Sequence, residues 1–70
     1  MSNAIRIVVN GESRQVPSGS TIAALLRLLE INPERVAVEL NREIVRRPDW
    51  PSTEVPADSE LEIVHFVGGG

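Results

Sequence analysis

The sequence of 70 residues contains no cysteine, and this absence removes a whole range of chemistry. Without cysteine the chain has no disulfide bond, no thiolate nucleophile and no thiolate ligand for zinc. Its single histidine, His65, has no second histidine with which to build a metal site or a histidine-based catalytic triad. These two shortages point away from most classes of enzyme.

Lysine is absent as well, because all seven basic residues are arginine. The chain therefore has no side-chain amine for Schiff-base catalysis. The formal net charge of −3 disfavours binding to nucleic-acid backbones and to anionic lipid surfaces. The longest apolar runs have only a handful of residues, far fewer than the roughly 20 that span a bilayer, and no signal-peptide pattern is present. We expect a cytoplasmic protein with neither nucleic acid nor membrane among its partners.

The sequence does contain enough apolar material for one small core. Hydrophobic residues make up 41% of the chain, and Trp50 and Phe66 are its only aromatic residues. A chain of this length forms one domain that buries only about 60% of its unfolded surface. We therefore expect a single domain over residues 1–70, in which residues 1–4 are tag-derived or disordered and residues 67–70 form a flexible tail.

Five short segments have the β-branched or alternating pattern that is typical of strands. These segments are 5–9, 12–16, 36–40, 43–45 and 60–67. The dipeptide Asn10–Gly11 predicts a hairpin, because both central residues of a type I′ turn need positive φ, and Asn41–Arg42 indicates a second tight turn. The second strand is polar and is expected at a sheet edge. Segment 46–56 contains three prolines and is expected to be a loop.

One amphipathic helix is predicted between the second and third strands. Its apolar stripe consists of Ile22, Leu25, Leu26 and Leu29. Ser20 or Thr21 is the expected N-cap, and Asn32–Pro33 is expected to end the helix.

The element order β-β-α-β-β-β can bury such a helix only by laying it across a single sheet. The predicted fold class is therefore α+β with a β-grasp layout, in which one helix packs across one mixed sheet. The last strand is expected to lie centrally, beside the first, because its two faces are both largely apolar.

Three of the five glycines stand together as Gly68, Gly69 and Gly70. Because glycine lacks Cβ, such a segment can thread a narrow channel and approach another molecule closely. The only reactive group at its tip is the α-carboxylate of Gly70, which becomes a good electrophile once it is joined to AMP. The alternative is a plain linker, but a linker usually continues into polar sequence, whereas this one follows an apolar strand directly.

Three segments of the sequence resemble the ThiS family, the ubiquitin-like sulfur carriers of bacterial thiamine biosynthesis. They are Val38-Glu39-Leu40-Asn41, Ile44-Val45-x-Arg47-x-x-Trp50 and Ile63-Val64-His65-Phe66-Val67-Gly68-Gly69-Gly70. The resemblance covers nearly the whole chain. The sequence departs from the family pattern at Arg42, where the turn often has glycine, and at Asp58-Ser59-Glu60, which replaces a common Asp-Gly-Asp turn.

The resemblance implies a function for the glycine tail. An E1-like adenylyltransferase, ThiF, would use ATP and Mg²⁺ to adenylate Gly70, and Gly69 and Gly68 would be needed for this activation. A sulfur-relay enzyme would then supply sulfur to form a thiocarboxylate, and thiazole synthase, ThiG, would take that sulfur. The chain itself would bind no cofactor, would not be an enzyme and would be a monomer when free.

Three residues next to the tail are candidates for docking onto these partners, namely Glu62, Phe66 and Val67. Other functions stay open at this point. The alternatives are a sulfur carrier for molybdopterin, tRNA thiolation or cysteine, a ubiquitin-like modifier of lysines, and a simple binding domain.

Overall fold

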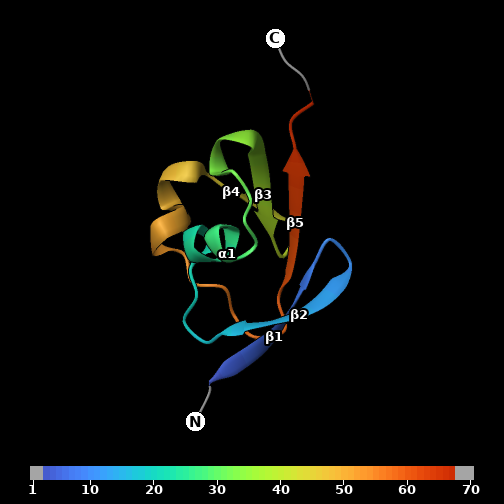
Figure 1. Ribbon diagram of the computed structural model, residues 1–70, viewed down its shortest axis with the longest axis vertical. Coiled ribbons are helices and arrows are strands. Elements are labelled where there is room, and N and C mark those ends of the chain that lie inside the picture. The colour runs from blue at the N-terminus through green and yellow to red at the C-terminus, as the bar shows by residue number, and fades with distance from the viewer. Residues whose placement is uncertain (1–2, 68–70) are drawn as a thin grey trace.

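The computed structural model describes residues 3–67, and within them five strands form one mixed sheet (Figure 1). The strands are β1 (Ala4–Val9), β2 (Glu12–Pro17), β3 (Val36–Leu40), β4 (Glu43–Val45) and β5 (Glu60–His65). Their order in the sheet is β2-β1-β5-β3-β4, with β1 and β5 parallel and all other neighbours antiparallel. The predicted β-grasp layout is confirmed, with the last strand at the centre and the polar second strand at an edge.

Both predicted tight turns are present. Asn10 and Gly11 have φ values of 50° and 83°, and Asn41 and Arg42 have φ values of 50° and 72°. Positive φ at both central residues is what a type I′ turn requires, and asparagine adopts it more readily than most residues. Ala4, which the sequence assigned to a tag-derived or disordered segment, begins β1 opposite Pro17.

The pairing between β1 and β5 is short and is extended by a side chain. Only Val8 and Val9 pair with β5 in the parallel ladder. The backbone N–H of Asn10 then donates to the Leu61 carbonyl at 2.9 Å. The Asn10 carboxamide donates to the Ile63 carbonyl at 3.1 Å and accepts from the Ile63 N–H at 2.8 Å. Asn10 therefore replaces one further residue of β1 in the ladder.

The helix α1 (Ile22–Leu28) begins as predicted but ends earlier. Thr21 is the N-cap, and its hydroxyl oxygen accepts a hydrogen bond from the Ala24 N–H at 3.1 Å. The predicted end at Asn32–Pro33 is wrong, because Glu30 adopts a left-handed conformation with φ of 59°. The N–H groups of Glu30 and Ile31 bond back to the carbonyls of Arg27 and Leu26, at 3.1 and 2.9 Å, in a Schellman arrangement.

Two 3₁₀ helices occupy segments that the sequence did not assign to helix. The first is η1 (Pro33–Arg35), which Asn32 caps by accepting from the Glu34 N–H at 3.0 Å. The second is η2 (Arg47–Ser52), so the prediction of a loop over residues 46–56 is wrong for its central part. Burial of Trp50 explains this local order. Its side chain is only 4% exposed and its indole N–H donates to the Val45 carbonyl at 2.7 Å.

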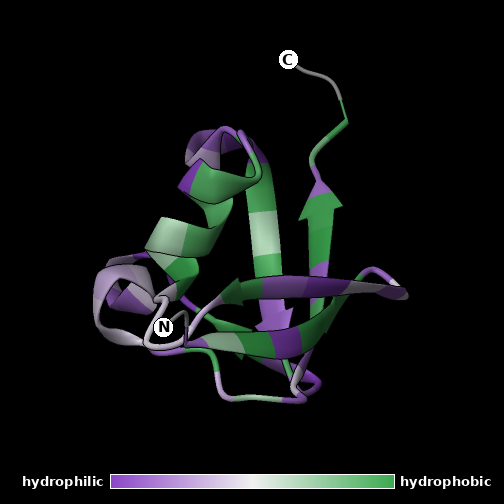
Figure 2. Ribbon diagram, turned by 60° about the horizontal axis from the view of Figure 1, so that its bottom comes forward, coloured by the Kyte–Doolittle hydropathy of each residue, from purple (hydrophilic) through white to green (hydrophobic). Residues whose placement is uncertain are grey.

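The core lies between α1, η2 and one face of the sheet. It consists of Ile7, Val9, Val16, Ile22, Leu25, Leu26, Val36, Val38, Trp50, Val55, Leu61 and Ile63. Figure 2 shows hydrophobic residues running along both β3 and β5. The helices cover only one face of the sheet, so the opposite face of β5, which carries both acidic and apolar side chains, remains open. Among residues 3–67 no helix has the length and apolar character needed to cross a membrane.

Replacing Asn10 by glycine tests the role of its carboxamide in the sheet. Glycine retains the positive φ but removes both side-chain hydrogen bonds to Ile63, so we expect a loss of about 1–2 kcal/mol in the free energy of unfolding. Urea denaturation measures this loss. Asn10→Asp, which retains the acceptor but turns a carboxylate oxygen toward the Ile63 carbonyl, should show at least as large a loss. Equal stability of Asn10→Gly and the unaltered chain would contradict the assignment.

Candidate functional site

The strand β5 runs toward the end of the molecule opposite the start of β1 (Figure 1). The strand ends at His65, two residues earlier than predicted, and Phe66 is still held by its N–H, which donates to the Arg35 carbonyl at 2.8 Å. Val67 follows with 98% of its side chain exposed. The predicted site residues Gly68, Gly69 and Gly70 lie outside the described residues.

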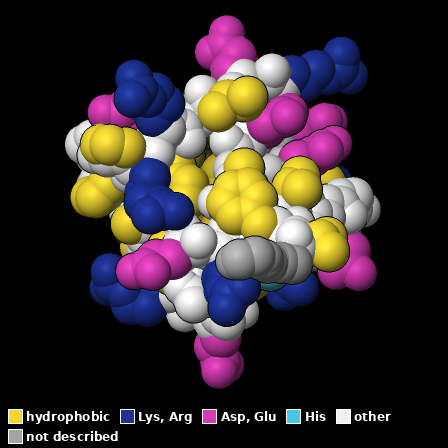
Figure 3. Space-filling view, turned by 90° about the horizontal axis from the view of Figure 1, so that it is seen from above, with side chains coloured by type: hydrophobic (Ala, Val, Ile, Leu, Met, Phe, Trp, Pro, Cys, Tyr) yellow, Lys and Arg dark blue, Asp and Glu magenta, His cyan; other side chains and the backbone are white. Residues whose placement is uncertain are grey.

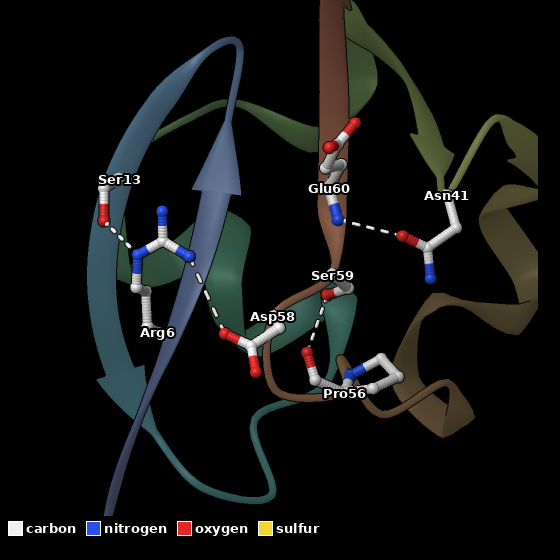
Figure 4. A network of polar contacts seen from close by, with 7 residues as sticks. All are labelled: Arg6, Ser13, Asn41, Pro56, Asp58, Ser59 and Glu60. Atoms are coloured by element: carbon white, nitrogen blue, oxygen red, sulfur yellow. Dashed lines mark hydrogen bonds and ion pairs between the residues drawn. The ribbon is translucent and has the colours of Figure 1, made fainter.

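The start of β5 is fixed by polar contacts to two different parts of the sheet (Figure 4). On one side the Asn41 side-chain oxygen accepts from the Glu60 N–H at 2.9 Å. On the other side Arg6 in β1 contacts Asp58 at 3.6 Å and donates to Ser13 at 3.0 Å. The strand that leads to the tail therefore starts from a defined position, held from both β1 and the β3–β4 turn.

The turn before β5 is one of the two places where the sequence departs from the family pattern. Asp58 has φ of 62° and so adopts the conformation for which glycine is usually preferred. Ser59 is buried, and its hydroxyl donates to the Pro56 carbonyl at 2.7 Å (Figure 4). The backbone N–H of Asp58 and the carbonyl of Ser59 bond to Arg6 and Val8 of β1. The turn that positions β5 is therefore kept although Ser59 stands where the family pattern often has glycine.

The open face of the sheet displays an exposed apolar patch beside the tail. Along β5, Leu61 and Ile63 point into the core, and the alternation of strand side chains places Val64 and Phe66 on the opposite face. Val64 and Phe66 are 51% and 56% exposed, and Ile44 in β4 is 73% exposed. We call these three residues, with Glu39 and Glu62 between them, the open-face patch. Figure 3 looks down on this end of the molecule and shows hydrophobic side chains gathered there, with acidic side chains beside them.

The two carboxylates of the open-face patch stand directly opposite each other. Glu39 in β3 pairs with Glu62 in β5, and Glu39 is also opposite Ile44 on its other side. Neither glutamate takes part in an ion pair within residues 3–67. Like charges in opposite positions destabilise a sheet, so this pair weakens the fold and leaves negative charge available to a cationic surface.

Sequence reasoning identified part of this patch and missed the rest. Of its predictions, Phe66 and Glu62 lie in the patch, and Val67 lies just beyond it. Val64 was not among the predicted contact residues. Glu39 and Ile44 were missed as well, although the alternation of their strands places them on one face. Their proximity to Glu62 depends on the register between β3, β4 and β5, which the sequence does not display.

Side-chain chemistry contributes little to this site. No group of three or more histidine, cysteine, aspartate or glutamate residues within the described part of the chain is placed to hold a metal ion. His65 is exposed at the end of β5, with its backbone opposite that of Val36. The site therefore offers a contact surface and a strand that leads directly into the tail.

Comparisons with known proteins agree on one family. The model of a family described as the ThiS family matches residues 5–70. Over 66 residues the chain is 39% identical to a thiazole synthase of Magnetococcus marinus, a match that covers 94% of this chain and 20% of that protein. Over 50 residues it is 40% identical to the sulfur carrier protein ThiS of Bacillus subtilis, covering 71% of this chain and 76% of that protein.

A solved structure gives the same result for the fold. The crystal structure of the thiamine biosynthesis protein (ThiS) from Geobacter metallireducens superposes with a TM-score of 0.83. The sequences are 32% identical, and the match covers 94% of this chain and 100% of that one. The chain spans only about a fifth of the length of the thiazole synthases that it matches.

Replacing Glu62 by glutamine tests the repulsion within the open-face patch. Removal of one of two opposed charges should raise the free energy of unfolding by about 0.2–1 kcal/mol at low salt, and added salt should reduce the gain. Thermal or urea unfolding at two salt concentrations measures it. Once Glu39→Gln is present, Glu62→Gln should add no further stability. An equal gain in both backgrounds would show that the two carboxylates do not interact.

Proposed function

The chain belongs to the ThiS family, and from this membership we propose that it carries the sulfur of the thiazole moiety of thiamine on the C-terminal carboxylate of Gly70. The observation that carries this proposal is the extent of the family match, which runs from residue 5 through the three glycines to residue 70. The relatives support it, since one is named a sulfur carrier and another is named a thiamine biosynthesis protein.

The proposed chemistry takes place at a backbone carboxylate. An oxygen of the Gly70 carboxylate attacks the α-phosphorus of ATP, pyrophosphate leaves, and the terminal carbonyl is joined to AMP. Hydrosulfide, or its equivalent from a sulfur-relay enzyme, then adds at this carbonyl and AMP leaves with the former carboxylate oxygen. The product is a thiocarboxylate. Mg²⁺ and ATP belong to the activating enzyme, where the metal neutralises phosphate charge during transfer.

The glycines explain how an enzyme would reach this carboxylate. Side chains next to the reacting carbonyl would obstruct a narrow active site, and Gly68, Gly69 and Gly70 have none. The fixed position of β5 supports this role, because the sheet presents the tail from one defined place. The chain itself acts as a protein cosubstrate, and the catalytic groups belong to its partners.

The proposed partners are an E1-like adenylyltransferase of the ThiF type and a thiazole synthase of the ThiG type. The thiazole synthases of Magnetococcus marinus and Paramagnetospirillum magneticum support the second partner, because each contains a segment that is 39% or 41% identical to this chain. Docking onto the adenylyltransferase would use Phe66 and Val67 as apolar contacts. The carboxylate of Glu62 would attract a basic surface around the enzyme's active site.

Intact-mass spectrometry tests the proposed carrier function. Incubation with the cognate adenylyltransferase, ATP, Mg²⁺ and sulfide should increase the mass by the difference between one sulfur and one oxygen atom. Deletion of Gly70, or addition of a residue after it, should abolish the change without lowering the melting temperature, because a chain terminus contributes little burial.

The control is the ThiS protein of Bacillus subtilis with its own adenylyltransferase under the same conditions. If that pair shows the mass change and this chain with its enzyme does not, the proposed function is wrong. A marked loss of melting temperature on deletion of Gly70 would assign the tail a structural role instead.

Reversing the charge of Glu62 tests the proposed electrostatic attraction. Glu62→Arg should slow adenylation several-fold at low salt, and the difference should shrink as salt screens the charges. Pyrophosphate release measures the rate. Glu54→Arg makes the same charge change at an exposed position paired with Thr21 at the start of the helix, and it should have little effect. Equal rates for Glu62→Arg and the unaltered chain at low salt would contradict the attraction.

A further inference from the structure

The two edges of β5 are occupied to different extents. Even-numbered residues direct their backbone groups toward β3, as shown by the bond from the Asn41 N–H to the Glu60 carbonyl at 2.7 Å and by the bond from Phe66 to Arg35. Odd-numbered residues face β1. Of these, the Leu61 carbonyl accepts from the Asn10 N–H. The carbonyl and the N–H of Ile63 are both hydrogen bonded to the Asn10 carboxamide.

The next odd-numbered residue, His65, has no such partner on the β1 side. The strand β1 ends at Val9, and the hairpin turns away at Asn10 and Gly11. Within residues 3–67 no backbone or side-chain group bonds to the N–H or the carbonyl of His65 from that side. If the chain stays extended, the backbone N–H and carbonyl of Val67 point the same way as those of His65. A short free edge therefore lies immediately before the glycine tail, on a strand that is otherwise central.

A recess with both aliphatic and polar lining residues lies near this free edge. It has a volume of about 330 Å³ and is lined by Val9, Ile63 and three residues around the end of α1, which are Leu28, Leu29 and Ile31. In β1 the side chains of Ile7 and Val9 point into the core, and the next core-facing side chain would follow if the strand continued. The hairpin ends the strand there, so the recess lies where that side chain would be. Leu28 is 54% exposed.

We propose that an extended segment of the adenylyltransferase adds to the sheet at this edge, pairs with His65 and Val67, and places an aliphatic side chain in the recess. This inference rests on the proposed function, because the enzyme that receives Gly70 must also pass the residues just before the tail. Free N–H and carbonyl groups along a strand edge are complementary to another extended backbone. An added strand would continue the line of β1 beyond Asn10.

The charges around the recess specify the side chain that fits. Glu12 and Arg14 line its rim and form an ion pair with each other at 3.5 Å. The remaining lining is aliphatic apart from Asn10, whose carboxamide is occupied by Ile63. The rim pair neutralises itself, so the recess attracts neither charge and favours an aliphatic residue. This contact differs from the open-face patch, which lies on the other side of the sheet.

Amide hydrogen exchange by NMR tests the strand addition on the full chain. Binding of the adenylyltransferase should slow exchange of the His65 amide by at least about tenfold, because a hydrogen bond replaces solvent. The Phe66 amide, already bonded to Arg35, is the internal control and should change much less. An unchanged His65 amide in the saturated complex would overturn the proposal.

A charge placed at the recess gives an independent test in the adenylation assay. Leu28→Asp should raise KM for the chain about tenfold with kcat unchanged, because the strand could no longer seat its aliphatic residue. Leu28→Met should restore the original KM. Ala57→Asp adds the same charge at an exposed turn remote from the recess and should leave KM unchanged. Melting temperatures of all variants show whether each is folded.

The outcomes separate this proposal from the proposed function. If the unaltered chain gains no sulfur, the proposed function fails, and hydrogen exchange in the complex still reports on the edge. If it gains sulfur and Leu28→Asp retains its KM, only the strand addition is overturned. Sedimentation of the free chain tests whether a second copy of the chain occupies the edge instead. A dimer that Leu28→Asp disrupts would assign the edge to that second copy and overturn the proposal.

Discussion

The structure depends on the placement of the last strand at the centre of the sheet. Leu61 and Ile63 are almost completely buried, and β5 is hydrogen bonded to β1 on one side and to β3 on the other. The fold is therefore completed only when residues 60–65 have paired with strands from both halves of the chain. The helix crosses the same sheet and covers one face, because a single layer of helix is all that this length provides. The opposite face and the end of β5 are left uncovered by the helices.

Much of this arrangement follows from local sequence signals. Asn10–Gly11 and Asn41 predict the two hairpins, because few residues adopt positive φ without an energetic cost. Thr21 and the apolar stripe define the start and the buried side of α1. The glycine tail is visible in the sequence alone. At the two hairpins and at the start of the helix, a short stretch of chain determines its own conformation, whatever the rest of the protein does.

The errors occur where distant residues decide the outcome. Glu30 ends the helix in a conformation normally associated with glycine, and nothing in its immediate sequence indicates this. The prolines of segment η2 suggested a loop. The segment is instead ordered because Trp50 is buried against the core. The opposition of Glu39 and Glu62 and the bonds from Asn10 to Ile63 depend on strand register. Register comes from the pairing of the whole sheet, and the sequence does not show which residues face each other.

The central position of β5 also determines how the molecule responds to a pull on its tail. A strand at the edge of a sheet can be peeled away, one hydrogen bond at a time. Here the bonds to β3 and β1 lie across the direction of the strand, so tension along β5 loads many of them together in shear. An enzyme that binds the glycines and pulls on them would therefore not unfold the domain, and only the tail would change its conformation.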